Sequence, residues 1–434
     1  MVNRKTKIYT ISDPAFLKQQ MLYWANRYNI CCLLDSNEYV SHYSKLDCIL
    51  AVDPVSFILP EKNILATLST YSNQIQDWLF GHISYDLKNE MAGLSSENPD
   101  NIGFPVLYFF QPAIVLQLNK NELTISSLTD DPEKIFSAIQ NTFCVKEKIQ
   151  AGNVSENIHF TPRITKENYI STIQKIKTHI LRGDCYELNF CQEFYGEKIA
   201  LNTVNLYQEL TNISPNPFAC YYKWNDRYLI CASPERYMQK KGSRLISQPI
   251  KGTLKRDLSN TLHDESLKMS LFTSEKDRSE NVMVVDLVRN DLSRICDMGT
   301  VQVDELFGIY QFPQVYQMIS TVSGNLRSGM DLGDILYASF PMGSMTGAPK
   351  LKVMQLIETY EKTKRGLYAG TVGYISPNKD FDFNVVIRSI QYNQSNSYLS
   401  YQVGGGITFY SDAEKEYEEC MTKAEAIHQV LTKH

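Results

Sequence analysis

A carboxyl group and a primary amine are brought close together by the sequence around Lys251. Glu235 follows a Ser-Pro pair, and Lys251 stands in the segment Pro-Ile-Lys-Gly-Thr. The runs 236–240 and 244–250 predict two short strands around a glycine-containing turn, which is typical of a β-hairpin. With the turn centred on Ser243, residue 235 lies opposite residue 251, and opposed residues project from the same face about 5 Å apart. Paired titratable groups are typical of functional sites; an edge ion pair is the alternative, and a one-residue slip would separate the two side chains.

Acidic side chains at helical spacing form a second group of candidate functional residues. Asp277 and Glu280 share one face of a predicted helix, and Glu416, Glu419 and Lys423 share a face of another. Two acidic helix faces that meet across a site could hold Mg²⁺, a hard cation that takes a few carboxylates and keeps several waters. Solvated salt-bridge faces also have these spacings, and they are the alternative.

Two glycine-rich segments could bind an anion. Residues 343–350 read Gly-Ser-Met-Thr-Gly-Ala-Pro-Lys and run into a predicted helix, whose free amides and dipole suit a carboxylate or phosphate. The order differs from a P-loop because proline precedes the lysine. Gly404, Gly405 and Gly406 follow a predicted strand and would let a ligand approach the backbone closely. For both segments, a glycine turn without a ligand is the alternative.

The elements that must position these residues follow from the apolar periodicity. It predicts four long helices, at 165–182, 274–295, 348–361 and 412–431. Runs typical of strands fall at 30–34, 106–110, 113–118, 123–127, 368–375, 382–390 and 397–404. Because strands and helices do not alternate strictly, we expect an α+β architecture rather than a doubly wound sheet. The polar stretch 150–164 predicts a linker between an N-terminal region, 1–149, and a C-terminal region, 165–434.

Composition argues against several classes of function. The chain has 434 residues, with 43 Lys and Arg against 48 Asp and Glu and a formal net charge of −5, so nucleic acid is not expected as a partner. No stretch is long and uncharged enough to predict a membrane span, and the N-terminus lacks the apolar core of a secretory signal. Ten scattered cysteines without a C-x-x-C pair predict small buried thiols in a reduced, cytoplasmic protein.

Taken together, the motifs resemble the chorismate-utilising family, which includes anthranilate, aminodeoxychorismate, isochorismate and salicylate synthases. The matching segments are 183–190, 233–236, 249–253, 276–291, 340–350, 365–370, 387–388 and 404–423. The resemblance implies an α+β fold built on a large two-layered antiparallel β-sandwich with helices packed outside. It also implies that region 1–149 is similar to the N-terminal part of anthranilate synthase component I, and that region 165–434 binds chorismate and carries out catalysis.

The same resemblance implies a covalent mechanism. Chorismate is a dicarboxylate whose ring hydroxyl is a poor leaving group, so its displacement needs a proton donor and a nucleophile. Lys251 would attack ring carbon 2 while Glu235 protonates the hydroxyl that leaves carbon 4, and ammonia would then add at carbon 4 and expel the lysine. Glu235 must then be protonated and Lys251 neutral. We expect a dry site to favour both states, because desolvation raises a carboxyl pKa and lowers an amine pKa.

Metal and substrate contacts are carried over in the same way. Glu280 and Glu419 are the implied Mg²⁺ ligands, with the metal neutralising a substrate carboxylate. The implied substrate-binding residues are Gly252, Thr253, Asp277, Ser344, Tyr368, Arg388, Gly404, Gly405, Gly406 and Lys423. For Tyr368 and Arg388, packing and an ion pair are the alternatives to substrate binding.

Lys251 also selects a branch of the family. Aminodeoxychorismate synthases resemble this chain at Pro-Ile-Lys-Gly-Thr, whereas anthranilate synthases usually have alanine in place of the lysine. Isochorismate and salicylate synthases usually carry a water-activating lysine where this chain has Glu187. The resemblance therefore implies an enzyme that aminates chorismate to 4-amino-4-deoxychorismate, the precursor of p-aminobenzoate and folate. Anthranilate synthase component I, or a non-catalytic subunit that binds chorismate or tryptophan, are the alternatives.

Three further features bear on partners and regulation. The sequence has no G-x-C-x-G nucleophile elbow, so the resemblance implies that a separate glutamine amidotransferase subunit supplies ammonia. Many relatives carry histidine where this chain has Gln317. Leu34, Asp35 and Ser36 resemble the tryptophan-binding segment of relatives, which makes tryptophan a candidate ligand, with an ordinary buried strand as the alternative.

Overall fold

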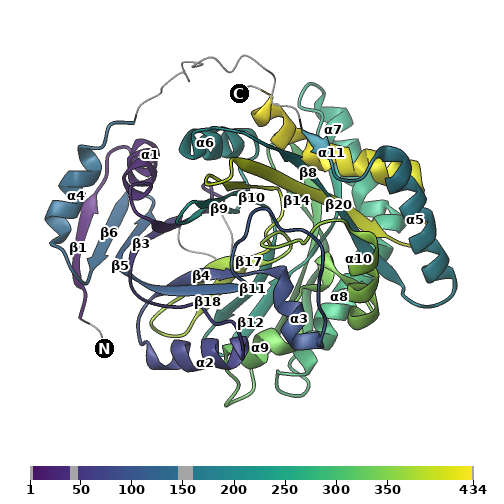
Figure 1. Cartoon of the computed structure of the whole chain (residues 1–434), viewed down its shortest axis with the longest axis horizontal. Helices are drawn as coiled ribbons and strands as arrows, with labels where there is room; N and C mark the ends of the chain where they lie inside the picture. The colour runs from purple at the N-terminus through teal and green to yellow at the C-terminus, as the bar shows by residue number, and fades with distance from the viewer. Residues whose placement is uncertain (1–2, 40–46, 145–159, 433–434) are drawn as a thin grey trace.

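Two antiparallel sheets lie face to face and share the long strand β5 (Leu107–Asn119), as Figure 1 shows. The computed structural model describes residues 3–39, 47–144 and 160–432. The first sheet runs in the order β1 (Lys5–Thr10), β6 (Glu122–Ser127), β5, β3 (Cys48–Ile58), β2 (Ile30–Asp35), β9 (Phe218–Trp224), β10 (Arg227–Ser233), β19 (Ser389–Asn393), β20 (Tyr398–Ile407), β8 (Glu187–Gly196), with the short β7 (Thr161–Pro162) and β16 (Gly347–Ala348) against β8.

The second sheet starts from the other part of β5. Its order is β5, β4 (Leu79–Ile83), β17 (Thr371–Ile375), β18 (Phe381–Asn384), β11 (Arg236–Lys241), β12 (Arg244–Gln248), β15 (Val315–Asn325) and β14 (Gln302–Gln311). Strand β13 (Ile250–Lys255) continues β12 along the same edge of β15. This arrangement matters for the site because β13 carries Lys251.

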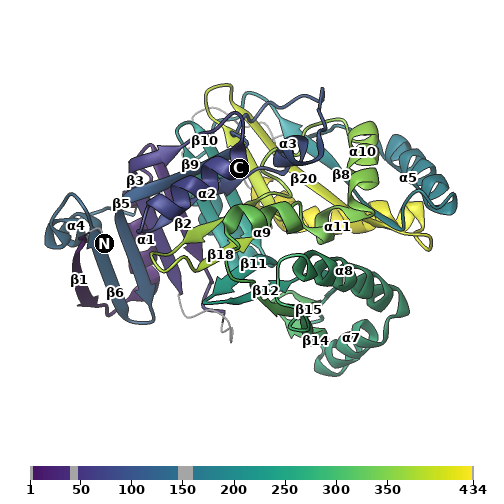
Figure 2. The same ribbon diagram turned by 90° about the horizontal axis from the view of Figure 1, so that it is seen from below.

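Helices cover the outer faces of both sheets. Against the first sheet pack α1 (Pro14–Ala25), α4 (Pro132–Gln140), α5 (Lys166–Leu181), α6 (Thr203–Ile213), α10 (Lys350–Tyr360) and α11 (Ala413–Leu431). Against the second pack α2 (Ile64–Gln74), α8 (Glu275–Ser293) and α9 (Leu332–Ser339). Figure 2 shows α8 and α7 (Thr261–Thr273) beside β14 and β15, and α3 (Lys88–Ala92) is a short further helix.

The strand residues alternate between two hydrophobic cores. In β2, Cys31 and Leu33 belong to the core under the helices, whereas Cys32 belongs to the core between the sheets. The same occurs in β10, where Ile230 faces the helices and Leu229 the opposite sheet. Since side chains of a strand point alternately to its two faces, a strand covered on both sides must be apolar throughout. This packing is a two-layered sandwich with helices outside, as the sequence predicted.

Helix boundaries follow local capping signals. Ser274 caps α8 by accepting from the amide of Asp277, and Asp412 caps α11 by accepting from the amide of Lys415. All four predicted long helices are present, as α5, α8, α10 and α11. The predicted strands 106–110 and 113–118 are one strand, β5.

The prediction of a single strand at 382–390 is wrong. Strand β18 pairs with β11 and β17 of the second sheet, whereas β19 pairs with β10 and β20 of the first. The chain therefore crosses between the layers at 385–388, and a regular strand cannot pair with both sheets. Arg388 lies in this crossing with a φ of 52°, a left-handed backbone that a strand does not contain.

The strands of the two predicted regions are hydrogen-bonded to each other. Strand β2 pairs with β9, and β4 pairs with β17, so regions 1–149 and 165–434 share both sheets. Of the predicted linker, residues 150–159 lie outside the described residues, and the division into regions stays a prediction. All ten cysteines are free thiols. Within the described ranges, no helix combines the length and apolar character needed to cross a membrane.

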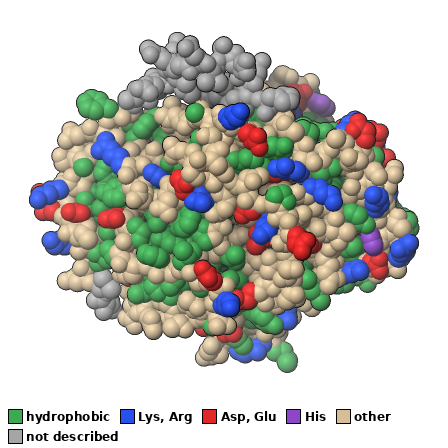
Figure 3. All heavy atoms as spheres, in the orientation of Figure 1, with side chains coloured by type: hydrophobic (Ala, Val, Ile, Leu, Met, Phe, Trp, Pro, Cys, Tyr) green, Lys and Arg blue, Asp and Glu red, His purple; other side chains and the backbone are tan. Residues whose placement is uncertain are grey.

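Charged side chains are mixed on the surface. On the face seen in Figure 3, Lys and Arg alternate with Asp and Glu, and hydrophobic side chains gather toward the left of the view. This distribution agrees with a chain whose positive and negative residues nearly balance.

Candidate active site

The hairpin that carries the acid and the amine has a different register from the predicted one. Lys241 pairs with Arg244, so the turn consists of Gly242 and Ser243 and is not centred on Ser243. A bulge in β11 just after Arg236 changes the pairing with β12 a second time, so the register at Glu235 differs from the register beside the turn. Residues 235 and 251 are therefore not directly opposed. They nevertheless line the same cavity, and the charge of Lys251 acts on the carboxyl of Glu235.

Glu235 and Lys251 line one cavity of about 110 Å³. Its walls come from β13, from the amino ends of α8 and β8, from β20, from the loop before α10 and from α11. The predicted site residues that line it are Glu235, Lys251, Gly252, Thr253, Asp277, Glu280, Ser344, Tyr368, Arg388, Gly404, Gly406, Glu419 and Lys423. Gly405 does not line this cavity; a Cβ at that position would lie 3.5 Å from Glu416 Oε2 and from Lys423 Nζ. Residues more than 180 positions apart in the sequence thus surround one small space.

Glu235 is a buried carboxyl that is poised to carry a proton. It is 4% exposed, and Ser344 donates a hydrogen bond of 2.6 Å to its Oε1. Burial raises the pKa of Glu235 to about 7, against the opposing effects of the Ser344 hydroxyl, the Lys251 charge and the Ile250 amide. Near neutral pH a substantial fraction is protonated, as the sequence-based mechanism requires.

Lys251 differs from its predicted state. Its ammonium forms a buried ion pair with Oε1 of Glu187, with the two side chains 9% and 2% exposed. Burial acts to lower the pKa of Lys251, but the carboxylates of Glu187, Glu280 and Glu235 together raise it above the ordinary lysine value. The prediction of a neutral amine is therefore wrong for the free protein. That prediction took account of desolvation but not of the three carboxylates that the fold places around the amine.

Three carboxylates surround the ammonium of Lys276. Its Nζ lies 3.1 Å from Glu416 Oε1, 3.8 Å from Glu419 Oε2 and 3.9 Å from Glu280 Oε1. Burial raises the pKa of Glu280 to about 7, while the charge of Lys423 leads the effects that lower the pKa of Glu419 to about 2. The two acidic helix faces do meet, as predicted.

This acidic cluster suits a divalent ion only in part. Oε1 of Glu280 is buried and has no hydrogen-bond partner among the described residues, which leaves it available to a cation. No group of three or more His, Cys, Asp or Glu side chains in the described ranges has the spacing of a metal site. Two carboxylates still suffice for Mg²⁺, which keeps several waters and takes substrate oxygens. Lys276 was not among the predicted site residues, although its four-residue spacing from Glu280 is a readable signal.

Two cationic side chains, Arg388 and Lys423, lie beside the acidic cluster. Arg388 donates a hydrogen bond of 2.6 Å to the carbonyl of Lys423, and burial lowers its pKa. Lys423 in turn contacts the carbonyl of Gly404 at 3.2 Å and Oε1 of Glu419 at 2.7 Å. The hydroxyl of Tyr368 lies 3.7 Å from Sγ of Cys191. These groups could pair with carboxylates of a dianionic ligand.

Glycine is needed at several positions of the site, for a different structural reason at each. A Cβ at Gly404 would lie 2.1 Å from the carbonyl of Phe190, so the pairing of β20 with β8 requires this glycine. A Cβ at Gly406 would lie 2.5 Å from Glu187 Oε1 and 2.7 Å from Lys251 Nζ. Gly252 has a φ of 87°, which other residues rarely adopt. The glycine at 406 therefore leaves room for the Glu187–Lys251 pair.

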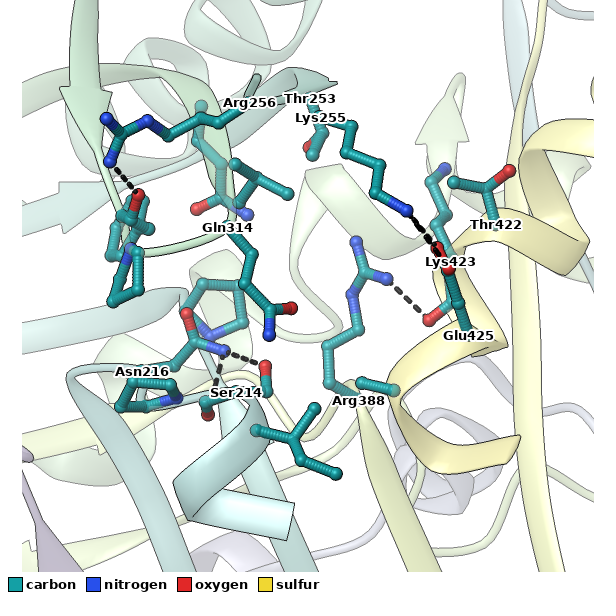
Figure 4. A pocket seen from close by; sticks show the side chains of 18 of the residues that line it. Ser214, Asn216, Thr253, Lys255, Arg256, Gln314, Arg388, Thr422, Lys423 and Glu425 are labelled. Atoms are coloured by element: carbon teal, nitrogen blue, oxygen red, sulfur yellow. Dashed lines mark hydrogen bonds and ion pairs between the residues drawn. The ribbon is translucent and has the colours of Figure 1, made fainter. Parts of the chain in front are cut away.

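A second cavity, of about 330 Å³, adjoins the first. The two share Pro234, Thr253, Gln317, Arg388, Glu419 and Lys423. Figure 4 shows Arg388 between Gln314 and the side chains of α11, and the ion pair of Lys255 with Glu425, 3.0 Å long, to one side. Because Lys255 and Glu425 are exposed, this outer chamber opens to solvent. Gln317 is buried where the chambers meet, and its Oε1 has no hydrogen-bond partner among the described residues.

The predicted tryptophan-binding residues lie elsewhere. Leu34, Asp35 and Ser36 line a separate cavity of about 60 Å³, together with Phe218 and Asn384. Oδ1 of Asp35 accepts a hydrogen bond of 2.9 Å from Lys18 Nζ. Leu34 and Asp35 belong to strand β2, and tryptophan binding at this small cavity stays a prediction.

Comparison with known proteins identifies the family of this chain. A family model described as chorismate binding enzyme matches residues 24–429. The chain belongs to the chorismate-binding enzymes. Within this family, aminodeoxychorismate synthase component 1 of Bacillus subtilis is 37% identical over 383 residues, covering 84% of this chain and 80% of that protein. Anthranilate synthase component 1 of Aquifex aeolicus is 31% identical over 370 residues, covering 81% and 74%.

Solved structures of the family have the same fold. The crystal structure of anthranilate synthase component I from Streptococcus pneumoniae matches with a TM-score of 0.74 and 25% identity, covering 90% of this chain and 93% of that chain. The α+β fold predicted from the sequence is confirmed by this match and by the observed strand pairing.

Proposed function

We propose that this chorismate-binding enzyme aminates chorismate at ring carbon 4 and releases 4-amino-4-deoxychorismate. The observation that carries the proposal is the buried pair of groups on one cavity: Lys251 as a nucleophile, and Glu235 as an acid whose pKa is about 7. The similarity to the B. subtilis aminodeoxychorismate synthase component 1 supports it. The anthranilate synthases among the relatives make anthranilate the product to exclude.

The residues act in sequence on a bound dianion. Arg388 and Lys423 hold substrate carboxylates, with Tyr368 and the amides at Gly252, Thr253 and the 404–406 glycines as further contacts. Lys251 attacks ring carbon 2, and Glu235 gives its proton to the hydroxyl that leaves carbon 4. Ammonia then adds at carbon 4, the bond to Lys251 breaks, and the product leaves through the outer chamber. In this scheme Ser344 keeps the Glu235 carboxyl oriented.

We also propose Mg²⁺ as the cofactor, held by Glu280 and Glu419 with Asp277 beside them. When bound, the ion would supply positive charge against a substrate carboxylate. Oε1 of Glu280, which accepts no hydrogen bond among the described residues, and the convergence of α8 and α11 support this assignment. Lys276, which contacts both carboxylates, supplies positive charge to them in the free protein.

The same proposal implies a partner subunit, and the family resemblance implies a further ligand. The name "component 1" of the B. subtilis relative supports a second component, and a glutamine amidotransferase subunit is the partner that would supply ammonia. Tryptophan is the proposed ligand of the cavity at Leu34, Asp35 and Ser36, by resemblance alone. The proposal concerns the p-aminobenzoate branch that leads to folate.

A product assay tests the proposal. The protein is incubated with chorismate, Mg²⁺ and ammonium, with and without a separate aminodeoxychorismate lyase, and the aromatic products are separated by chromatography. We expect p-aminobenzoate only when the lyase is present. Anthranilate formed without lyase would make the protein an anthranilate synthase, and tight chorismate binding without any product would make it a binding subunit.

A variant pair tests the nucleophile. Lys251→Ala should lower the amination rate by more than about a hundredfold, because the covalent route is lost. Lys241→Ala is the matched control, since Lys241 lies at the exposed turn of the same hairpin. Equal rates for the two variants would remove Lys251 from the mechanism.

A further inference from the structure

The proton of Lys251 has no assigned destination in the scheme above. The amine can attack only after it loses a proton, yet the structure holds it as a buried ammonium beside carboxylates. Each turnover must therefore begin with a proton transfer from Nζ. The acceptor has to be close, because the cavity gives solvent little access to this atom.

Three carboxylates raise the pKa of Lys251, and Glu419 lines the same cavity; these four groups differ in the contacts they already make. Glu235 accepts from Ser344 and must keep its own proton for the departing hydroxyl. Glu419 is paired with Lys423, and Glu280 interacts with Lys251 without forming an ion pair within 4 Å. Glu187 is the one carboxylate among the described residues that is in hydrogen-bond contact with Nζ of Lys251.

The surroundings of Glu187 suit a group that receives and returns a proton. Its side chain is 2% exposed, and only Oε1 is engaged; Oε2 is buried without a hydrogen-bond partner among the described residues. Glu187 begins β8 and is paired with Ala348 of β16, which fixes its backbone. Gly406 leaves space beside the pair that any larger residue would fill. The contact is thus buried, and strand pairing holds the backbone of Glu187 in place.

We propose that Glu187 is the base that takes the proton from Lys251 before the attack and returns it when the lysine leaves. This inference rests on the proposed amination of chorismate. An N–H bond of Lys251 breaks and an O–H bond forms on Glu187. The freed lone pair bonds to ring carbon 2, both ring double bonds shift by one position, and the hydroxyl at carbon 4 leaves as water with the proton of Glu235.

The second half of the reaction restores both groups. Ammonia bonds to carbon 4, both double bonds shift back, and the bond between carbon 2 and Lys251 breaks with its electrons on nitrogen. Lys251 then regains its proton from Glu187, and the new ammonium on carbon 4 gives a proton to Glu235. The balance is chorismate plus ammonia to aminodeoxychorismate plus water, with no other reactant.

Glu187→Gln tests the proposal, since glutamine keeps the size and can still accept a hydrogen bond but cannot take the proton. At pH 7 we expect kcat to fall by about 10²–10⁴-fold, the usual contribution of a general base, with little change in KM for chorismate. The rate of the variant should recover as pH rises, because solvent must then remove the proton. Glu193→Gln is the matched control: Glu193 lies on the same strand and is buried, but it pairs with Arg163 and Tyr398 away from the cavity.

A second measurement separates a base from a structural partner. The rate at which an amine-selective reagent modifies Lys251, followed by peptide mass spectrometry over pH, reports how much free amine is present. Because Glu187 raises the pKa of Lys251, Glu187→Gln should shift this labelling to lower pH while kcat falls. More free amine with less turnover is expected for a lost base and not for a damaged site.

The outcomes are distinct. Wild-type kcat and pH profile in Glu187→Gln, or a kcat at pH 7 that rises above the wild-type value as the labelling increases, would overturn the role of Glu187. If the wild-type protein forms anthranilate or no product in the lyase assay, the proposed function fails whatever the variant does. Wild-type amination with an unaffected Glu187→Gln variant would refute this inference and leave the function standing.

Discussion

Removing the hydroxyl of Ser344 should move the pH range in which the enzyme works. That hydroxyl donates a hydrogen bond of 2.6 Å to Oε1 of Glu235 and stabilises its charged form. In Ser344→Ala this stabilisation is lost, while the burial that raises the pKa of Glu235 stays. The pKa of Glu235 must therefore rise above about 7.

The size of the shift follows from the strength of the bond. A hydrogen bond to a charged group contributes about 1.5–3 kcal/mol, and one pKa unit corresponds to about 1.4 kcal/mol. We expect the pKa of Glu235 to rise by about one to two units. Because Glu235 acts in its protonated form, activity is present below its pKa and is lost above it. The alkaline limb of the pH profile should therefore move to higher pH in Ser344→Ala.

The assay measures kcat/KM for chorismate from pH 6 to 9, which reports groups of the free enzyme. Free ammonia must be held constant at each pH, since its own protonation changes over this range. Ser339→Ala is the control, because Ser339 is equally buried but bonds to Ile335 and Tyr237 outside the cavity. An alkaline limb that stays in place, or moves to lower pH, would refute the assignment of Glu235 as the acid.

Two further variants test the metal site and the support of the cavity. Glu280→Gln should raise the Mg²⁺ concentration for half-maximal activity at least about tenfold, and direct titration with Mn²⁺ should show the same loss; unchanged Mn²⁺ binding would exclude Glu280 as a ligand. Arg365→Met should lower the free energy of unfolding in urea by about 3–5 kcal/mol, because Arg365 is 1% exposed and its removal leaves Glu361 buried and unpaired. Arg289→Met, which removes an exposed pair with Asp286, should change it by less than about 1 kcal/mol.

Local sequence patterns were enough to predict the helices and the types of side chain that form the site. Helix α8 could be predicted from its apolar period and from the cap at Ser274, and that helix fixes Asp277 and Glu280 on one face. The hairpin at Gly242 and Ser243 could be predicted from its glycine, but its register could not. The register at the turn differs by one residue from the predicted register, and the bulge after Arg236 has no sequence signature.

The charge state of the nucleophile depended on contacts between distant segments. Glu187 and Lys251 are 64 residues apart and meet because β8 pairs with β20 beside Gly406. Desolvation alone predicted a neutral lysine, whereas the carboxylates around it keep it charged. The crossing at 385–388 brings Arg388 beside Lys423. It likewise could not be predicted from local sequence, because it depends on how the strands of both sheets pair.

The amino-acid sequence by itself determined the α+β class and the types of side chain in the site, since these depend on residue type and short-range spacing. Its motifs also indicated the family, and that resemblance implied the two-layered sandwich and the action on chorismate. Only the tertiary structure decided which carboxylate contacts the lysine, and which residues form the outer chamber. The reason is physical: register, burial and electrostatic field are set by segments far apart in the chain, and a pKa responds to all of them together.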